Sequence, residues 1–429
     1  MSVIGTPAPM EWNDGFQEVL ERVEEGRRCL FVTGKAGTGK STLLRHLRTH
    51  VLGQAVVLAP TGVAAVHVGG QTLHSFFRFP PQVLFPEAVR RLSGGALYRN
   101  LRTLIIDEVS MVRADVVDAM DLFLRSHGPE AGLPFGGVQM VFFGDLHQLP
   151  PVVSPHEVEA FRSLYESPWF FKARAFARLA YDRVDLKKVY RQKDRGFLSL
   201  LNAVRGGEAE PEDLAALNGR MDLSFQPGEG DPHITLTATN LAADRVNGRK
   251  LEELGGGMAL YPAALQGEFE PKLFPTDEPL ALKAGAQVML LKNHPQGEWV
   301  NGTLGTVAAM GPDAISVEIP GRAAGPVRVE RAAWESIRYL LDPATGKILP
   351  KPVGRFTQFP LKLAWAMTIH KSQGKTFERV IIDMGKGAFA HGQSYVALSR
   401  CTTLEGITLR RPLSDRDLFL DPEVLEFLA

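Results

Sequence analysis

Residues Cys29–Thr49 read CLFVTGKAGTGKSTLLRHLRT, and this stretch decides the fold. Its apolar start predicts a buried strand (Cys29–Thr33), and a helical pattern begins at Thr42. Between them, the letters GKAGTGKS fit the spacing G-x-x-x-x-G-K-[ST]. A strand, a glycine-rich loop and a helix in this order predict a phosphate-binding loop.

The residue types in this loop suit a nucleoside triphosphate and Mg²⁺. Gly34 and Gly39 let backbone N–H groups surround phosphate oxygens, Lys40 supplies positive charge to the β and γ phosphates, and the Ser41 hydroxyl suits Mg²⁺. We therefore expect ATP to contact the loop and the first turn of the helix, at Gly37, Thr38, Gly39, Lys40, Ser41 and Thr42.

An Asp-Glu pair follows a second apolar run, in TLIIDEVS. Asp107 ends the predicted strand, where its carboxylate can hold Mg²⁺ through water, and Glu108 can polarise an attacking water. A metal ligand beside a base favours ATP hydrolysis. The spacing alone leaves open the transfer of phosphate to a small acceptor, as in a kinase.

Apolar runs of the same kind recur in the first half as AVVLAP and QMVFFGD, each followed by a polar or glycine-containing turn. Continuous apolar strands are typical of a parallel sheet that is covered on both faces. The chain has 429 residues, of which 45% are apolar. Because one core stops growing near roughly 250–300 residues, we expect an α/β protein with at least two domains.

The second half starts another α/β pattern, which is interrupted. Short strands separated by Gly and Pro, from about Met289 to Arg355, predict a small antiparallel barrel, and FERVIID then resumes the α/β pattern. We place a first domain at residues 1–183, with a proline-rich excursion at about 76–100. A second domain takes 184–289 and 361–429, and an inserted β domain takes 290–360.

Charge and cysteine content exclude several classes. Lys+Arg and Asp+Glu each number 48, so any contact with nucleic acid must be local. Cys29 and Cys401 lie in apolar runs, which favours buried reduced thiols over a disulfide or a zinc site. No targeting segment is recognisable, and no run reaches the ~20 apolar residues of a membrane span. We expect a soluble, cytoplasmic protein.

The motifs together resemble one family. PFGGVQMVFFGDLHQLPPV (Pro134–Val152) is similar to the signature stretch and third motif of the PIF-type DNA helicases, in the 5′-to-3′ group of superfamily 1. Other motifs follow in the family's order: APTGVAAVHVGGQTLHSFF, VYRQ, TIHKSQGKTFERVIID and YVALSRCTTLEGITL. The resemblance extends from about Phe16 to Leu409, and the compact length suggests a minimal core of bacterial or viral type.

The resemblance implies two RecA-like domains that hold ATP between them, with a small wedge in the first and an SH3-like barrel in the second. It assigns Gln17 to the adenine edge, Gly374 to the nucleotide and Gln148 to sensing of the γ phosphate. It also implies that Arg191 and Arg400 reach the γ phosphate from the second domain, and such an arginine finger is worth roughly 10³–10⁵ in rate. The alternative for Gln17 is an exposed glutamine on a helix. The alternative for Arg191 and Arg400 is that each forms an ion pair at the surface.

The resemblance also implies a grip on a DNA strand in each domain. A non-specific grip needs donors to phosphate and flat groups on which bases stack. Phe76 could stack on a base or belong to the core. For His370 the alternative is a buried histidine whose hydrogen bonds are satisfied, and for Asn301 it is a turn with no role in binding. The residues assigned to DNA are Thr61, Gly62, Thr72, His74, Ser75 and Phe76 in the first domain and Asn240, His370, Lys371 and Ser372 in the second.

The implied function is an ATP-dependent DNA helicase that translocates 5′ to 3′ on single-stranded DNA and unwinds partial duplexes and forks. Members of the family are associated with G-quadruplexes, RNA–DNA hybrids, repair, recombination and telomere maintenance. We expect a monomer that associates with the bacterial nucleoid. Two alternatives stay open, a RecD-like DNA motor and an ATP-gated protein that binds single strands with little unwinding. The DNA-type motifs disfavour a small-molecule kinase.

Overall fold

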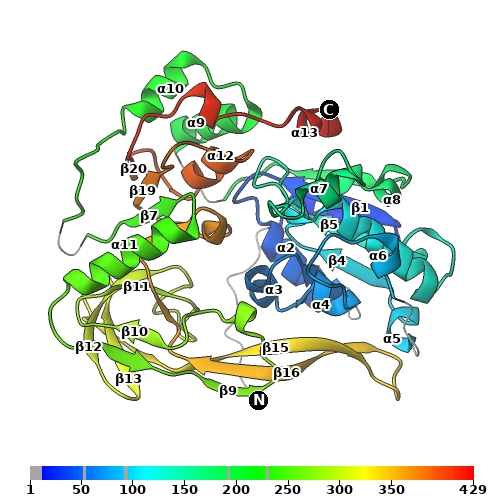
Figure 1. Ribbon diagram of the computed structural model, residues 1–429, viewed down its shortest axis with the longest axis horizontal. Helices are drawn as coiled ribbons and strands as arrows, with labels where there is room; N and C mark the ends of the chain where they lie inside the picture. Colours follow the sequence, from blue (N-terminus) through cyan, green and yellow to red (C-terminus); the bar gives the residue numbers. More distant parts are fainter. Residues whose placement is uncertain (1–11, 52–54, 91–94, 191–193, 229–230) are drawn as a thin grey trace. The chain divides into compact units, whose positions relative to one another are not determined.

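The structure is a computed structural model that describes residues 12–51, 55–90, 95–190, 194–228 and 231–429 (Figure 1). Two compact units make up the chain. The N-terminal unit contains the described residues 12–190 together with Glu335–Gly354 and Phe427–Ala429, and the C-terminal unit contains 194–334 and 355–426. Within these described ranges, no helix has the length and apolar composition needed to cross a membrane.

A six-stranded parallel sheet forms the centre of the N-terminal unit, in the order β3-β2-β4-β5-β1-β6. Its central strands are buried almost throughout, which explains why their sequences are continuously apolar instead of alternating. The strands are β1 (Cys29–Gly34), β2 (Val56–Ala59), β3 (Gln71–Thr72), β4 (Thr103–Ile106), β5 (Gln139–Phe143) and β6 (Asp182–Leu186). Strand β6 crosses the predicted domain boundary at residue 183.

Short helices connect and cover these strands. The α-helices are α1 (Asp14–Glu24), α2 (Lys40–His46), α3 (Gly62–Val68), α4 (Leu73–Phe77), α5 (Ala96–Arg99), α6 (Ala114–His127), α7 (Val158–Arg162) and α8 (Arg174–Ala177). A π-helical turn, η1 (Leu47–Val51), continues α2. The 3₁₀ turns are η2 (Pro86–Ala88), η3 (Val109–Met111), η4 (Pro134–Gly137) and η5 (Phe170–Lys172).

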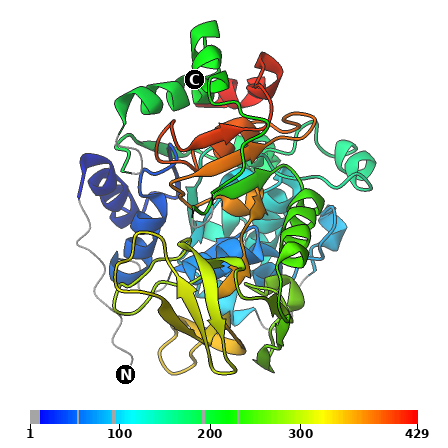
Figure 2. The same cartoon turned by 90° about the vertical axis from the view of Figure 1, so that its left-hand side faces the viewer.

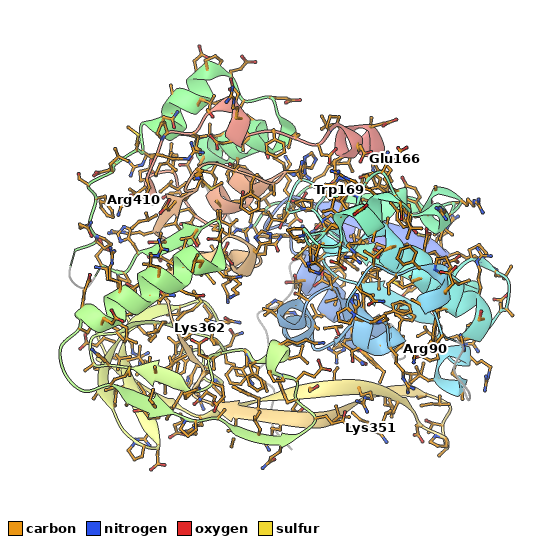
Figure 3. All side chains as sticks on the ribbon, in the orientation of Figure 1. Arg90, Glu166, Trp169, Lys351, Lys362 and Arg410 are labelled. Atoms are coloured by element: carbon orange, nitrogen blue, oxygen red, sulfur yellow. The ribbon has the colours of Figure 1, made fainter. Side chains whose placement is uncertain are left out.

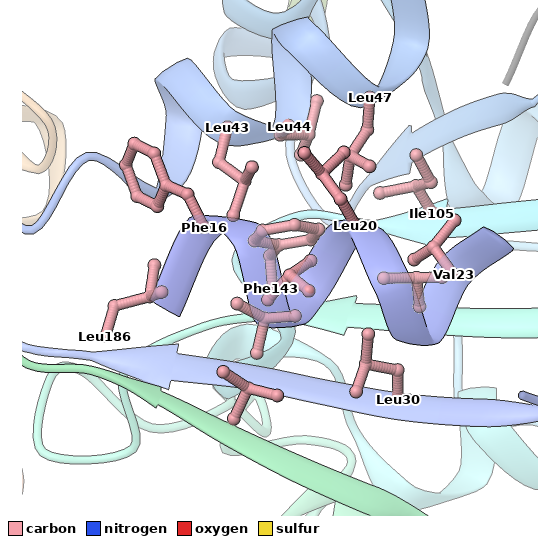
Figure 4. Packing of buried hydrophobic residues seen from close by; sticks show 14 of the residues in the cluster. Phe16, Leu20, Val23, Leu30, Leu43, Leu44, Leu47, Ile105, Phe143 and Leu186 are labelled. Atoms are coloured by element: carbon pink, nitrogen blue, oxygen red, sulfur yellow. The ribbon is translucent and has the colours of Figure 1, made fainter. Parts of the chain in front are cut away.

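Helix α1 packs one apolar face onto this sheet (Figure 4). Phe16 and Leu20 lie in a buried cluster with Leu30 of β1 and Leu43 of α2. The helix begins after Asn13, whose side-chain oxygen accepts a hydrogen bond from the Phe16 backbone N–H at 3.0 Å. The segment before the phosphate loop is thereby fixed against the sheet that carries the loop.

The C-terminal unit has its own parallel sheet, in the order β18-β7-β19-β20. Its strands are β7 (Ile234–Thr237), β18 (Ala366–Thr368), β19 (Val380–Asp383) and β20 (Ile407–Leu409). Its helices are α9 (Arg195–Gly206), α10 (Pro211–Asn218), α11 (Asn240–Glu253) and α12 (Gln393–Leu398), with α13 (Pro422–Leu428) at the end of the chain. The 3₁₀ turns are η6 (Pro271–Leu273), η7 (His370–Ser372) and η8 (Asp415–Asp417).

Antiparallel strands separate β7 from β18. Five of them form a sheet in the order β14-β13-β12-β11-β17 around a core that includes Val288, Ile315 and Val317, and Figure 2 shows β12–β14 in yellow. Two smaller sheets have the orders β10-β8 and β15-β16-β9. The strands are β8 (Ala259–Tyr261), β9 (Ala264–Gly267), β10 (Leu280–Leu282), β11 (Gln287–Leu290), β12 (Leu304–Met310), β13 (Ala314–Glu318), β14 (Val327–Glu330), β15 (Ala332–Leu341), β16 (Ile348–Gln358) and β17 (Leu361–Leu363).

These strands confirm the predicted α/β fold class, with two parallel sheets and antiparallel sheets between parts of the second. The antiparallel region extends from β8 to β17, which is longer than the predicted 290–360. Strands β8, β9 and β10 have only three or four residues each, too few for a period-two pattern to show.

The tip of the β15–β16 hairpin belongs to the N-terminal unit. Tyr339 is 3% exposed, and its hydroxyl accepts a hydrogen bond from the Val57 backbone N–H at 3.0 Å. Strand β3 pairs only with Leu58 and Ala59, so Tyr339 extends the bonding of β2 by one residue. Phe427, near the chain end, stacks on Phe171 with ring centroids 4.2 Å apart.

Candidate functional site

The phosphate loop forms as the sequence predicts, between the end of β1 at Gly34 and the start of α2 at Lys40. Gly37 and Gly39 both have φ of 84°, a left-handed conformation that costs glycine little. A Cβ on Gly39 would lie 2.8 Å from Cζ of Phe16, so α1 also requires glycine there. The loop is therefore a compact turn of backbone, as a phosphate cradle requires.

Lys40 lies inside this turn. Its Nζ donates hydrogen bonds to the carbonyl oxygens of Gly34 at 2.7 Å and Lys35 at 3.0 Å. Thr38 closes the loop, because its hydroxyl donates to the Lys35 carbonyl at 3.0 Å. The ammonium group is thus held within the loop, where it would meet phosphate oxygens.

The Asp-Glu pair follows β4 directly. Asp107 is 6% exposed, and burial, reinforced by the carboxylate of Glu108, raises its pKa to about 7. The Lys40 ammonium acts in the opposite direction, which places it within electrostatic reach of Asp107. Glu108 has φ of 49°, a conformation that is rare outside glycine and that marks a sharp turn after the strand.

Gln148 lies in the loop after β5. Its side-chain NH₂ donates to Oδ2 of Asp145 at 3.1 Å, and Oδ1 of Asp145 accepts from the His147 backbone N–H at 3.2 Å. Asp145 is fully buried, so it fixes the direction of the Gln148 side chain. A Cβ on Gly144 would lie 2.8 Å from Val109, so this loop packs closely against the loop that follows β4.

Three neighbouring strands bring these groups together. Strands β4, β5 and β1 are adjacent in the parallel sheet, so their carboxyl ends lie at one edge. In open α/β sheets, ligands bind outside the carboxyl ends of the strands. Lys40 and Ser41, Asp107 with Glu108, and Gln148 all follow these ends. The donor set, a cation, hydroxyl and carboxylate oxygens and an amide, fits ATP with Mg²⁺.

The residues assigned to DNA in the N-terminal unit follow the next two strands, β2 and β3. Thr61 caps α3 by accepting from the Ala64 N–H, and Thr72 caps α4 by accepting from the Ser75 N–H, each at 3.3 Å. Gly62 begins α3, and the partly buried His74 and exposed Ser75 lie on α4. Phe76 is 4% exposed and packs on Phe77 and Tyr98, so it belongs to the core.

A corresponding pattern occurs in the C-terminal unit, where β18 and β7 are adjacent. Asn240 is exposed at the start of α11 after β7, and η7 with His370, Lys371 and Ser372 follows β18. Burial lowers the pKa of His370, which favours the neutral imidazole. The Ser372 hydroxyl is fully buried and donates to the Ile369 carbonyl at 2.7 Å, so its position is internal.

Arg400 is buried within the C-terminal unit at 1% exposure. Its Nε donates to the Val396 carbonyl at 2.9 Å, and Nη1 donates to the carbonyls of Ser372 and Lys375, each at 3.3 Å. These bonds join the end of α12 to the segment that contains η7 and Gly374, where the backbone turns with φ of 75°. The guanidinium is therefore rigidly connected to the predicted DNA-contacting segment.

Two residues that were assigned to the nucleotide, Arg191 and Gln17, are not among the groups described above. Arg191 lies outside the described residues. Gln17 is exposed on α1, where its side-chain nitrogen donates to Oε1 of Glu21 at 3.1 Å, one helical turn away.

Sequence reasoning missed residues that position the site. Asp145 was not singled out, although its place at the end of β5 in GDLHQ parallels that of Asp107 after β4. Tyr190 was also missed: its N–H donates to the Gly37 carbonyl at 2.9 Å, and its hydroxyl accepts from the Asn13 side chain at 2.9 Å. Only a contact distant in sequence could have revealed it.

Known proteins are similar to this chain in sequence. A sequence model of the family described as PIF1-like helicase matches residues 11–214. The ATP-dependent DNA helicase Pif1 of Bdellovibrio bacteriovorus is 33% identical over 93% of this chain and 87% of its own length. The chain belongs to the PIF1-like helicase family. The family predicted from the motifs is thereby confirmed.

Other PIF1-like helicases match over most of the chain. The human ATP-dependent DNA helicase PIF1 is 35% identical over 96% of the chain, and the chain spans 62% of the length of that protein. The structure of unliganded Pif1 from Bacteroides sp is 36% identical, covers 98% of this chain and 96% of its own, and superposes with a TM-score of 0.89. Bacteroides Pif1 bound to ssDNA gives a TM-score of 0.70, with 97% of this chain and 96% of its own covered.

Proposed function

We propose that this PIF1-like chain is a DNA-stimulated ATPase and helicase that moves 5′ to 3′ along single-stranded DNA. The observation that carries the proposal is that Lys40, the Asp107–Glu108 pair and Gln148 converge at the carboxyl ends of three adjacent strands. The segments assigned to DNA follow the next two strands of the same sheet. One rigid sheet therefore supports both the nucleotide site and one strand grip.

ATP with Mg²⁺ supplies a phosphoanhydride bond whose hydrolysis releases free energy. Lys40 stabilises negative charge on the β and γ phosphates, while Ser41 and Asp107 would hold Mg²⁺. The Lys40 ammonium lowers the pKa of Asp107 and so opposes the effect of burial. Glu108 orients the attacking water. Gln17 and Gly374 contact the nucleotide in this assignment.

The motor follows from two grips that alternate. Gln148 connects the state of the γ phosphate to the N-terminal grip, and Arg191 and Arg400 add positive charge from the second RecA-like domain. ATP draws the domains together and hydrolysis lets them part, with one nucleotide of travel per ATP. The division into two RecA-like domains, with an SH3-like insertion in the second and a small wedge in the first, is part of this proposal.

Relatives support DNA as the partner. Solved structures include Bacteroides Pif1 bound to ssDNA, and one concerns unwinding at forked dsDNA by two coordinating Pif1 helicases. We propose that this chain also acts on single-stranded and forked DNA, with G-quadruplexes and RNA–DNA hybrids as further substrates. In the same proposal the protein is monomeric in solution and acts on the bacterial nucleoid in repair and recombination.

Tailed duplexes test activity and polarity together. With ATP, a partial duplex that carries a 5′ single-stranded tail is expected to separate, whereas one with a 3′ tail stays intact. Strand separation is followed by the release of a labelled strand, and forks, G-quadruplexes and RNA–DNA hybrids are ranked in the same assay. ATP turnover that single strands stimulate, without separation of any substrate, would favour the ATP-gated binding protein.

Replacing Glu108 by glutamine tests the assigned base. Glu108→Gln is expected to lower the rate of ATP hydrolysis by about 10²–10⁴, the usual contribution of a positioned base, because the amide cannot accept a proton from water. Binding of ATP and Mg²⁺ should persist, measured by titration with a fluorescent nucleotide. Glu87→Gln, an exposed glutamate of the same unit, is the control, and normal hydrolysis by Glu108→Gln would contradict the role.

A further inference from the structure

Three lysines of the C-terminal unit lie within fourteen residues of one another in sequence, at the join between the antiparallel region and the parallel sheet. Lys362 lies on β17 opposite Met289 of β11, and Figure 3 labels it. Lys371 lies on η7, and Lys375 follows the turn at Gly374. Only two residues separate β17 from β18, which keeps Lys362 near the segment that follows β18.

The contacts of these lysines connect two parts of the unit. Nζ of Lys375 donates to Oδ1 of Asn301 at 3.2 Å, and the Asn301 backbone N–H donates to Oδ1 of Asn293 at 2.7 Å. The loop between β11 and β12 therefore reaches the segment after η7. Nζ of Lys362 lies 3.3 Å from Oδ1 of Asp277.

Negative charge does not balance this cluster. Among the residues that the structure describes, no carboxylate oxygen lies within 4.0 Å of Nζ of Lys371 or Lys375. Burial and the charge of Lys362 lower the pKa of Lys375, and burial followed by Lys362 lowers that of Lys371. Asp244 and Asp277 act in the opposite direction on Lys371. The ammonium groups thus repel one another in partly desolvated positions.

We propose that Lys362 and Lys375 form, with Lys371, a site for the phosphate backbone of single-stranded DNA. The inference rests on the proposed function, since it extends the C-terminal strand grip from η7 to the inserted antiparallel region. A bound phosphate supplies the missing negative charge, and the Asn301 amide holds Lys375 in place until it arrives. Lysine acts here as a point charge, so the site binds every base sequence alike.

The salt dependence of DNA binding reports how many phosphates the lysines neutralise. For single strands, log K falls against log[salt] with a slope of about −0.7 per phosphate neutralised. Lys362→Ala and Lys375→Met are each expected to make the slope shallower by about 0.7, measured by fluorescence anisotropy with a labelled oligothymidylate and no ATP. The matched control is Lys272→Ala in the same unit, an exposed lysine paired with Glu270 at 2.7 Å, which should leave the slope unchanged.

Two outcomes separate this inference from the proposed function. A wild-type protein that does not bind the oligonucleotide would overturn the proposed function. The wild type could instead bind with a steep slope of log K against log[salt]. If the lysine variants then show the same slope, only the lysine site would be overturned. An oligouridylate bound as tightly, with the same lysine dependence, would overturn the choice of DNA over RNA.

Asp277→Asn is expected to change the affinity for DNA in the direction opposite to the lysine variants. Removing the carboxylate beside Lys362 is expected to tighten binding by about two- to fivefold at low salt, the range of one exposed ion pair. A merely structural role for this cluster predicts weaker binding for Asp277→Asn as well as for the lysine variants. Thermal unfolding of each variant checks that the fold is kept, and weaker binding by a folded Asp277→Asn protein would overturn the proposal.

The lowered pKa values of Lys371 and Lys375 provide a second test of the site, through the protons that are taken up on DNA binding. Phosphate raises the pKa of Lys371 and Lys375 above its value in the unbound protein, so binding takes up protons at a pH between the two values. Affinity therefore falls as the pH rises through the unbound values. Uptake is measured by calorimetry in buffers of different ionisation enthalpy. Lys362→Ala should reduce it, because the repulsion by Lys362 is removed, and unchanged uptake would contradict the cluster.

Discussion

Replacing Lys40 by alanine is expected to leave a protein that binds single-stranded DNA but scarcely hydrolyses ATP. The ammonium group is held 2.7 Å from the Gly34 carbonyl, inside the turn that would surround the phosphates. Removing one preorganised donor of this kind costs about 10²–10³ in kcat. In the proposed function Lys40 also stabilises bound ATP, so kcat/KM is expected to fall further than kcat.

Steady-state ATPase rates with and without an oligonucleotide measure this effect, and anisotropy measures DNA binding. Lys40→Arg is the informative companion, since it keeps the charge but replaces the compact ammonium, which donates to two carbonyls, by a planar guanidinium. Lys35→Ala, in the same loop, retains the Lys35 carbonyl that accepts from Lys40 and serves as the control. Undiminished turnover by Lys40→Ala would remove this residue from the site.

Arg400→Ala is expected to lower DNA-stimulated ATP turnover by about 10³ or more, the range of an arginine finger, while ATP affinity stays within about tenfold. The guanidinium also donates to the carbonyls of Ser372 and Lys375, on either side of Gly374. The loss should therefore appear in the coupling of turnover to DNA as well as in the rate.

Because Arg400 is buried, stability must be separated from chemistry. Truncating a buried group with several hydrogen bonds leaves acceptors without partners and costs about 1–3 kcal/mol for each. Unfolding curves therefore accompany the rates, and Arg400→Lys, which keeps the charge, is the second variant. A folded Arg400→Ala protein whose stimulated rate equals that of the wild type would exclude the finger.

The parallel sheet and the phosphate site could be predicted because their signals are local. A strand, a glycine loop and a helix determine where Lys40 and Ser41 lie, and a buried strand ending in Asp107 determines where that carboxylate lies. The side-by-side order of β4, β5 and β1 then brings them together. Motif spacing contains this information because each group follows the end of its strand.

Other features depend on contacts distant in sequence. Phe76 lies in a segment that sequence assigns to DNA, but its ring packs on Tyr98, 22 residues later. The Ser372 hydroxyl is used internally by Ile369, and Tyr190 supports a loop that lies more than 150 residues earlier. The beginning of the antiparallel region was missed because its first strands span no more than two periods of alternation.

Thr61 and Thr72 each use one oxygen to receive a backbone N–H at the start of a helix. The bond to the backbone does not use the hydroxyl hydrogen, so in the proposed function the oxygen that caps the helix would also donate to the DNA strand. Such an oxygen is already immobilised before the ligand arrives, and little rotational entropy is lost on contact. Travel along a polymer favours groups of this kind, because the same contact must form afresh at every step.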